Sequence, residues 1–181
     1  MRPFRQCCHQ PPSPVLGSAG VPAGSSPRFY SGPQTRDTLN TVPSSIRIRR
    51  EILDALLTHA RINSPNESCG LLAGRNSTIT NFYPTENASP TPTTNYEIPP
   101  QDLFRTMREL RNTNLDLLAI YHSHPASDNA PSPTDITRAY YPETPYIIVS
   151  PRAGAPNPIR AFQIRNNTVT ELSIQTISNG Q

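Results

Sequence analysis

Apolar residues between positions 46 and 175 recur at two spacings, one typical of helices and one typical of strands. The helical spacing predicts a helix over roughly 49–61, a second helix that follows Pro99 and Pro100, and a third from Ser132 to about Tyr140. The apolar faces of the first two helices comprise Ile52, Leu53, Leu56, Leu57 and Ala60, then Leu103, Met107 and Leu110.

Strands are predicted between these helices. Ile46 and Ile48 indicate a short first strand, and residues 69–73 and 79–83 a hairpin. Apolar runs at 115–121 and 146–149 are typical of buried strands, and 159–164 and 168–174 flank Asn166-Asn167, a strong turn signal. Helices and strands therefore alternate without internal repeats, which predicts an α/β domain with a mixed sheet flanked by helices.

The first 44 residues lack this patterning. They contain eight of the 22 prolines of the chain and few large apolar residues. Such a segment buries too little surface to offset the entropy that it would lose on ordering. We therefore expect a disordered tail over 1–44, one domain over 45–176 and a short C-terminal tail over 177–181.

The charge distribution argues against a nucleic-acid partner. The net charge of +3 arises in the first 44 residues, which carry Arg2, Arg5, Arg28, Arg36 and Asp37. The rest of the chain is balanced, with no basic stripe and no Trp, so we expect no nucleic-acid-binding face.

The apolar runs and the cysteines bear on location. No run has the length of a signal peptide or a transmembrane helix, so we expect no membrane association. Cys7, Cys8 and Cys69 form no disulfide framework, which fits a reduced cytoplasmic setting. We interpret Cys69 as a small buried hydrophobe rather than a nucleophile, because no base pairs with it in the sequence.

Candidate metal ligands follow the strand predicted at 115–121. Residues i and i+2 of an extended backbone point to the same side, so His122 and His124 can face one ion. Asp135 lies in the first turn of the third predicted helix. Two His and one Asp suit a catalytic zinc, which leaves its fourth position for water. Glu67, upstream, is a candidate proton shuttle.

Each of these residues also has a simpler explanation. Ser132-Pro133-Thr134-Asp135 is a good helix start, with Ser at the N-cap and an acid at the third helical position. His122 and His124 could be exposed loop histidines, and Glu67 a solvated loop acid. The metal hypothesis is preferred because it explains all four positions together. His59 lies on the first predicted helix with no partner at ligand spacing, and His9 lies in the segment expected to be disordered.

The combined motif resembles that of the JAMM/MPN+ (Mov34/MPN/PAD-1) zinc metallopeptidases. Their signature is a Glu followed by a Gly, then His-x-His-Pro, then Ser-x-x-Asp. The matching residues here are Glu67, Gly70, His122, His124, Pro125, Ser132 and Asp135. The resemblance extends over roughly 46–175 and is strongest to small stand-alone prokaryotic members.

This resemblance implies a single MPN-type domain with a cytidine-deaminase-like layout. It implies that His122, His124 and Asp135 hold Zn²⁺, that Glu67 is the general acid–base and that Ser132 stabilises the oxyanion. It also implies hydrolysis of the peptide or isopeptide bond after the Gly-Gly tail of a ubiquitin-like or sulfur-carrier protein. The motif leaves the oligomeric state open.

Three other classes of protein fit the sequence less well. A nucleobase deaminase would require a Pro-Cys-x-x-Cys element, and no cysteine follows Cys69. A non-catalytic MPN-type binding or scaffold module is typically without the ligands, whereas the full set is present here. A DNA-repair-associated family usually has Ser-Gly after His-x-His-Pro, where this chain has Ala126-Ser127.

Overall fold

The computed structural model describes residues 44–178. The predicted N-terminal tail, except for residue 44, lies outside this range together with Cys7, Cys8 and His9, as do residues 179–181 of the predicted C-terminal tail. Ile177, placed in that tail by the prediction, is the last residue of a strand. The elements in chain order are β1 (Ser45–Arg49), α1 (Arg50–Asn63), β2 (Cys69–Arg75), β3 (Thr78–Thr85), α2 (Pro100–Thr113), β4 (Asp116–Ser123), α3 (Pro133–Thr137), β5 (Tyr146–Val149), β6 (Ile159–Arg165) and β7 (Thr168–Ile177). Every predicted helix and strand has a counterpart among them.

Two predicted boundaries need correction. Helix α3 ends at Thr137 rather than near Tyr140, because the backbone leaves helical geometry at Arg138, whose φ and ψ are −98° and 14°. Strand β4 continues past Tyr121 through Ser123. His122 is therefore part of the sheet, where it lies between Cys69 of β2 and Ile148 of β5.

The strands form one mixed sheet that closes on itself. Their order is β1-β3-β2-β4-β5-β6-β7, and β1 pairs in parallel with both β3 and β7. The β4–β5 pair is also parallel, whereas the β2–β3, β2–β4, β5–β6 and β6–β7 pairs are antiparallel. The predicted mixed sheet with flanking helices is thus confirmed; its closure through β1 was not predicted.

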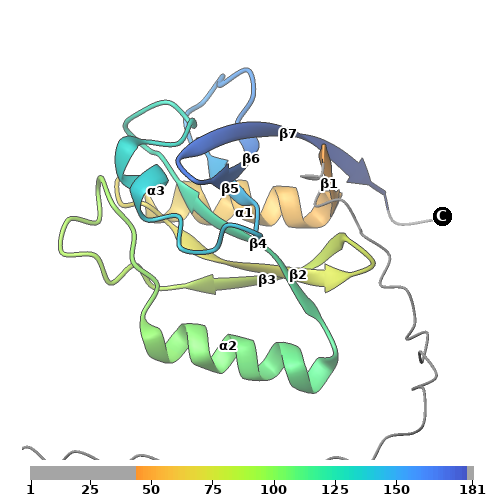
Figure 1. Cartoon of the computed structure of the whole chain (residues 1–181). Helices are drawn as coiled ribbons and strands as arrows, with labels where there is room; N and C mark the ends of the chain where they lie inside the picture. The colour runs from red at the N-terminus through yellow and green to blue at the C-terminus, as the bar shows by residue number, and fades with distance from the viewer. Residues whose placement is uncertain (1–43, 179–181) are drawn as a thin grey trace, which may run out of the picture. The chain divides into compact units, whose positions relative to one another are not determined.

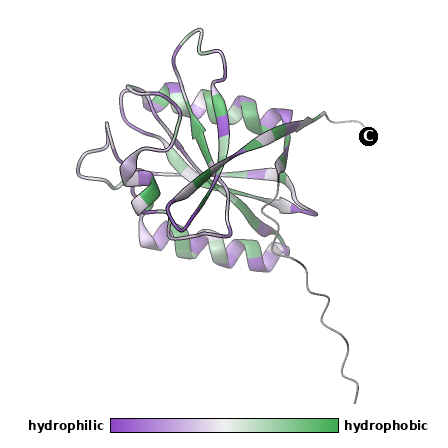
Figure 2. Ribbon diagram, turned by 45° about the horizontal axis from the view of Figure 1, so that its top comes forward, coloured by the Kyte–Doolittle hydropathy of each residue, from purple (hydrophilic) through white to green (hydrophobic). Residues whose placement is uncertain are grey.

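Buried apolar residues form two clusters, and the ribbon of the strands is coloured as hydrophobic over much of its length (Figure 2). One core packs α1, through Ile52, Leu53 and Leu56, against the strands. The other gathers residues of β2, β4, β5 and β6 under Leu103 of α2 and Ile136 of α3. Strands β2, β3 and β4 consequently lie between α1 and α2 (Figure 1). None of the helices within 44–178 combines the length and apolarity that crossing a membrane requires.

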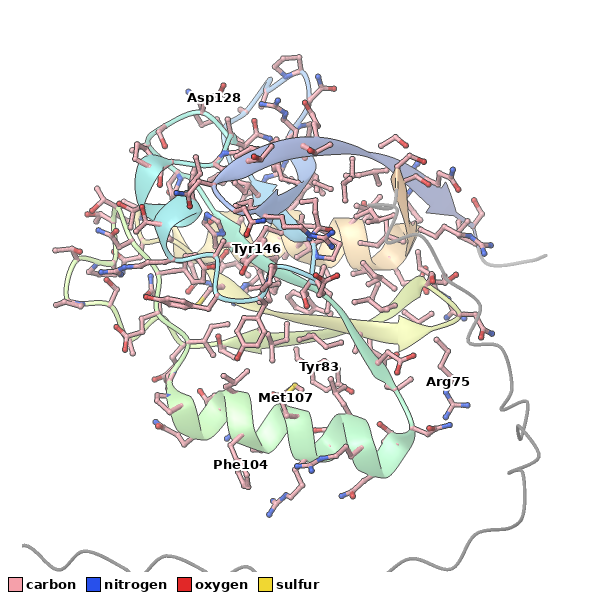
Figure 3. The ribbon with its side chains drawn as sticks, viewed as in Figure 1. Arg75, Tyr83, Phe104, Met107, Asp128 and Tyr146 are labelled. Carbon is pink, nitrogen blue, oxygen red and sulfur yellow. The ribbon has the colours of Figure 1, made fainter. Side chains whose placement is uncertain are left out.

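Helix α2 covers its face of the sheet incompletely. Leu110 is buried, and Met107 lies on the side that faces Tyr83 but is 36% exposed (Figure 3). Phe104 points away from the sheet and is 63% exposed. The predicted face of Leu103, Met107 and Leu110 therefore packs on the sheet, with Met107 at its margin.

Both tight hairpins use two-residue turns with positive φ. Asn166 and Asn167 have φ of 51° and 61°, and Asn76 and Ser77 have φ of 50° and 57°. Positive φ at both central residues is the type I′ geometry that matches the twist of paired strands, and Asn tolerates it well. The Asn-Asn turn predicted between the last two strands is confirmed.

Gly70 lies in β2, where the chain has no room for a side chain. A Cβ there would lie 2.3 Å from the backbone oxygen of Tyr83 and 2.7 Å from the Tyr121 ring. We predict that Gly70→Ala lowers the free energy of unfolding by about 1–3 kcal/mol, because β3 must shift to relieve the overlap. Urea denaturation monitored by circular dichroism measures this; an unchanged midpoint would show that the strands yield freely.

Candidate metal centre

Three side chains converge where β4 ends and α3 begins. His122 and His124 project from the end of β4 to one side, and their Nε2 atoms lie 3.0 Å apart. Asp135 of α3 places Oδ1 3.2 Å from Nε2 of His122 and Oδ2 3.3 Å from Nε2 of His124. The backbone N–H of His124 donates to Val149 at 2.9 Å, which anchors the chain beyond the strand.

The spacing of these atoms fits zinc. Ligands bound tetrahedrally at 2.0–2.1 Å from one ion stand about 3.3 Å apart. The separations of 3.0, 3.2 and 3.3 Å are close to that value. One atom from each of the three residues is thus already gathered as an ion of this size requires.

The hydrogen bond behind His124 determines which of its ring nitrogens faces the cluster. Its Nδ1 lies 2.7 Å from the backbone oxygen of Asp128. A carbonyl only accepts hydrogen bonds, so Nδ1 carries a proton, and Nε2 is the ring atom that can bind a metal once it is deprotonated. Burial acts against protonation of the ring, but the contacts with Asp135 and with the backbone oxygen of Asp128 outweigh it and raise the pKa of His124. Histidine ligands of zinc commonly donate a hydrogen bond from the ring nitrogen that does not bind the metal, which fixes the orientation of the ring.

Burial and mutual contacts set the charges of the cluster. Burial lowers the pKa of His122, which favours a neutral ring. Burial acts against ionisation of Asp135, but hydrogen bonds from His122 and His124 outweigh it and hold its pKa well below the usual range. The cluster therefore presents a carboxylate and at least one neutral imidazole, both of which suit a divalent cation.

Asp135 also caps α3, so the two explanations considered for it coexist. Its Oδ2 accepts from the backbone N–H of Ser132 at 2.7 Å, and Oγ of Ser132 accepts from the backbone N–H of Asp135 at 3.2 Å. This reciprocal capping box fixes the direction of the carboxylate. The interpretation of His122 and His124 as exposed loop histidines is wrong, because they are 0% and 3% exposed.

Glu67 lies just before β2 and is buried, with 5% of its surface exposed. The neighbouring Ser68 holds it beside β4, since its backbone N–H donates to Oγ of Ser123 at 2.8 Å. Burial raises the pKa of Glu67 to about 7, an effect that the charge of His124 opposes and that of Asp135 assists. The alternative of a solvated loop acid is therefore wrong.

Cys69 and His59 lie outside the cluster of ligands. The thiol of Cys69 is buried within 3.4 Å of Oγ1 of Thr85, and burial raises its pKa to about 11. Such a thiol stays protonated near neutral pH and packs as a small hydrophobe. Nδ1 of His59 lies 3.0 Å from the hydroxyl of Tyr121, at the margin of the core.

Two residues that contact the histidines, Tyr96 and Asp128, were not predicted from the sequence. The ring of Tyr96 stacks on His122, with centroids 4.3 Å apart and an interplanar angle of 17°. Tyr96 also lines a cavity of about 460 Å³ that reaches Asp135 and Tyr146. The backbone oxygen of Asp128 contacts Nδ1 of His124. Every residue has such an oxygen, so the residue type at position 128 does not predict this contact. A tyrosine in a Pro- and Thr-rich loop carries no spacing signal either.

Comparison with known proteins gives consistent results. Residues 49–165 match the family described as prokaryotic homologs of the JAB domain. The chain is 35% identical to a desampylase of Haloferax volcanii, over 60% of this chain and 82% of the relative. It is 31% identical to a CysO-cysteine peptidase of Mycobacterium tuberculosis, over 72% of this chain and 90% of the relative.

A solved structure shares the fold. Protein DSY2949 of Desulfitobacterium hafniense is 28% identical and superposes with a TM-score of 0.66, covering 74% of this chain and 94% of the other. The family match spans more than half of the chain and contains every residue of the predicted motif. The chain therefore belongs to the prokaryotic homologs of the JAB domain, the small JAMM/MPN proteins that its motif resembles.

Proposed function

We propose that this protein is a zinc-dependent peptidase or isopeptidase that hydrolyses the bond after the C-terminal Gly-Gly tail of a ubiquitin-like or sulfur-carrier protein. The observation that carries the proposal is the convergence of His122, His124 and Asp135 at zinc-ligand spacing beside the buried Glu67. Relatives named desampylase and CysO-cysteine peptidase support cleavage of protein conjugates.

In this proposal the three ligands bind the metal, and Glu67 transfers the proton. Zinc held by His122, His124 and Asp135 would supply an acidified water and a polarised carbonyl. Glu67 takes up a proton from the attacking water and returns it to the leaving amine. A pKa raised to about 7 suits both steps, because the carboxyl can then exist in either form near neutral pH.

Ser132 retains a hydrogen-bond donor although it caps α3. Its Oγ accepts from the backbone N–H of Asp135, and a serine hydroxyl can accept and donate at once. The O–H hydrogen is consequently free for the oxygen that becomes negatively charged during hydrolysis. Loss of one such donor typically slows a reaction by about 10²–10³.

A hydrolysis assay tests the function directly. The purified, zinc-loaded protein is incubated with a Gly-Gly-terminated ubiquitin-like protein that carries either a C-terminal amino acid or a lysine-linked peptide. Mass spectrometry should show release of the adduct after the second glycine, and a chelator should stop it until zinc is restored. If every adduct survives the zinc-loaded protein, the chain is instead a non-catalytic binding module.

A further inference from the structure

Asn87 makes an unusual set of contacts in the loop between β3 and α2, a stretch without helix or strand. Its Nδ2 donates to the backbone oxygen of Glu67 at 2.9 Å and to that of Asn95 at 3.0 Å. A longer contact of 3.4 Å joins it to the oxygen of Pro92. One amide group thus links the backbone of the candidate general base to two other points of the loop.

The oxygen of the same side chain is also fully used. Oδ1 of Asn87 accepts from the backbone N–H groups of Ser89 and Glu97, both at 3.0 Å. A carboxamide offers two N–H donors and an oxygen with two lone pairs, so this side chain has no hydrogen-bonding capacity left. It replaces, within the loop, the backbone ladder that a helix or strand would provide.

The first group that depends on this arrangement is Glu67. Its backbone oxygen accepts from Asn87, and its backbone N–H donates to Pro92 of the same loop at 2.7 Å. Both peptide groups of Glu67 are therefore tied to the loop. The direction of its buried carboxyl group follows from these two contacts and from the β4 contact of Ser68.

The second group is Tyr96, whose ring stacks on His122. The residues on either side of it are held by Asn87, since Nδ2 bonds to Asn95 and Oδ1 to Glu97. The amide therefore fixes both peptides that flank Tyr96. Through them it sets where the ring lies over the metal-ligand histidine.

We propose that Asn87 is a positioning residue for the hydrolytic reaction. It acts through Glu67, whose carboxyl group it aims, and through Tyr96, whose ring it holds against His122. The proposal rests on the proposed function for its kinetic consequence. Its geometric consequence, the Tyr96–His122 stack, is independent of any substrate.

The kinetic test is Asn87→Ala, assayed well below its unfolding temperature. We expect kcat to fall by about 10–100-fold with KM within a factor of about three, because a base displaced by about 1 Å loses alignment without loss of substrate contacts. The matched control is Asn63→Ala, which removes a 2.9 Å amide-to-carbonyl bond to His59 at the end of α1. The control should keep the wild-type kcat.

A double-mutant cycle separates positioning from loop stability. If Asn87 acts through Glu67, Asn87→Ala should change the residual rate of Glu67→Gln by less than about threefold. A full additional loss in that background would overturn the action through Glu67. Should Asn87→Ala fail to fold, Asn87→Asp keeps the two acceptor contacts and removes the donors to Glu67 and Asn95.

Nuclear magnetic resonance of the histidine ring protons gives a readout without substrate. A stacked tyrosine shifts the His122 ring protons upfield, so Tyr96→Leu should move them downfield, and Asn87→Ala should move them the same way. Unchanged His122 shifts in Asn87→Ala, together with an unchanged kcat, would overturn the proposal. If the wild type cleaves no adduct, the proposed function fails, and the shifts alone decide whether Asn87 positions Tyr96.

Discussion

Replacing Glu67 by glutamine is expected to slow hydrolysis of a Gly-Gly adduct by about 10²–10⁴-fold, while zinc content and fold stay unchanged. Glu67 is not one of the three residues that form the candidate ligand set, so loss of its carboxyl group should leave the ion in place. The amide is nearly isosteric with the acid, which keeps the packing of this buried position. It cannot, however, take up the proton of the attacking water.

Single-turnover rates and zinc analysis of the purified variant measure the two halves of this prediction. Glu86→Gln is the matched control, because Glu86 is an exposed acid that starts the β3–α2 loop. The control should hydrolyse the adduct at the wild-type rate. A wild-type rate for Glu67→Gln itself would mean that another residue is the base.

The raised pKa of Glu67 also predicts how the wild-type rate varies with pH. Burial favours the protonated form, with a pKa of about 7 before a cation is bound, and a bound cation would lower that value. Only the carboxylate can accept a proton, so kcat/KM should fall as pH decreases through this pKa. The same fall in the residual kcat/KM of Glu67→Gln would contradict the assignment of Glu67 as base, because this variant has no carboxyl group to titrate.

The convergence of His122, His124 and Asp135 was predictable because most of its constraints are local. The i, i+2 spacing of His122 and His124 in an extended strand and the capping geometry around Asp135 both follow from a few adjacent residues. What brings them together is the parallel pairing of β4 with β5, with α3 in the connection between these two strands, a pairing that was not predicted. The local geometry that these adjacent residues predict is the geometry found in the folded chain.

The surroundings of the cluster were not predictable in the same way. Tyr96 reaches His122 through a loop without periodicity, and that loop is organised by the side chain of Asn87. Closure of the sheet depends on β1, whose two partners lie far away in the sequence. Contacts of this kind depend on the assembled fold rather than on residue type and spacing, so a single sequence gives them no signal.

Asp135→Ala is expected to abolish stoichiometric zinc binding, because it removes one of three candidate protein ligands. The side chain serves twice, as a candidate ligand beside the two histidines and as half of the α3 capping box. Loss of the cap costs about 0.5–2 kcal/mol of stability, whereas loss of the carboxylate leaves only two ligands for the ion. Metal analysis after dialysis and urea denaturation measure these two effects separately.

Ser132→Ala provides the matched control because it removes a side-chain contact of the same capping box, the bond from the backbone N–H of Asp135 to Oγ. It should lose a similar amount of stability, retain its zinc and lose rate by about 10²–10³ through the missing oxyanion donor. Asp135→Asn separates the roles further, since its amide oxygen can still accept from the backbone of Ser132 but is a weaker zinc ligand than a carboxylate. A full complement of zinc in both Asp135 variants would show that this residue only caps α3, and the metal centre would then have to be built on other ligands.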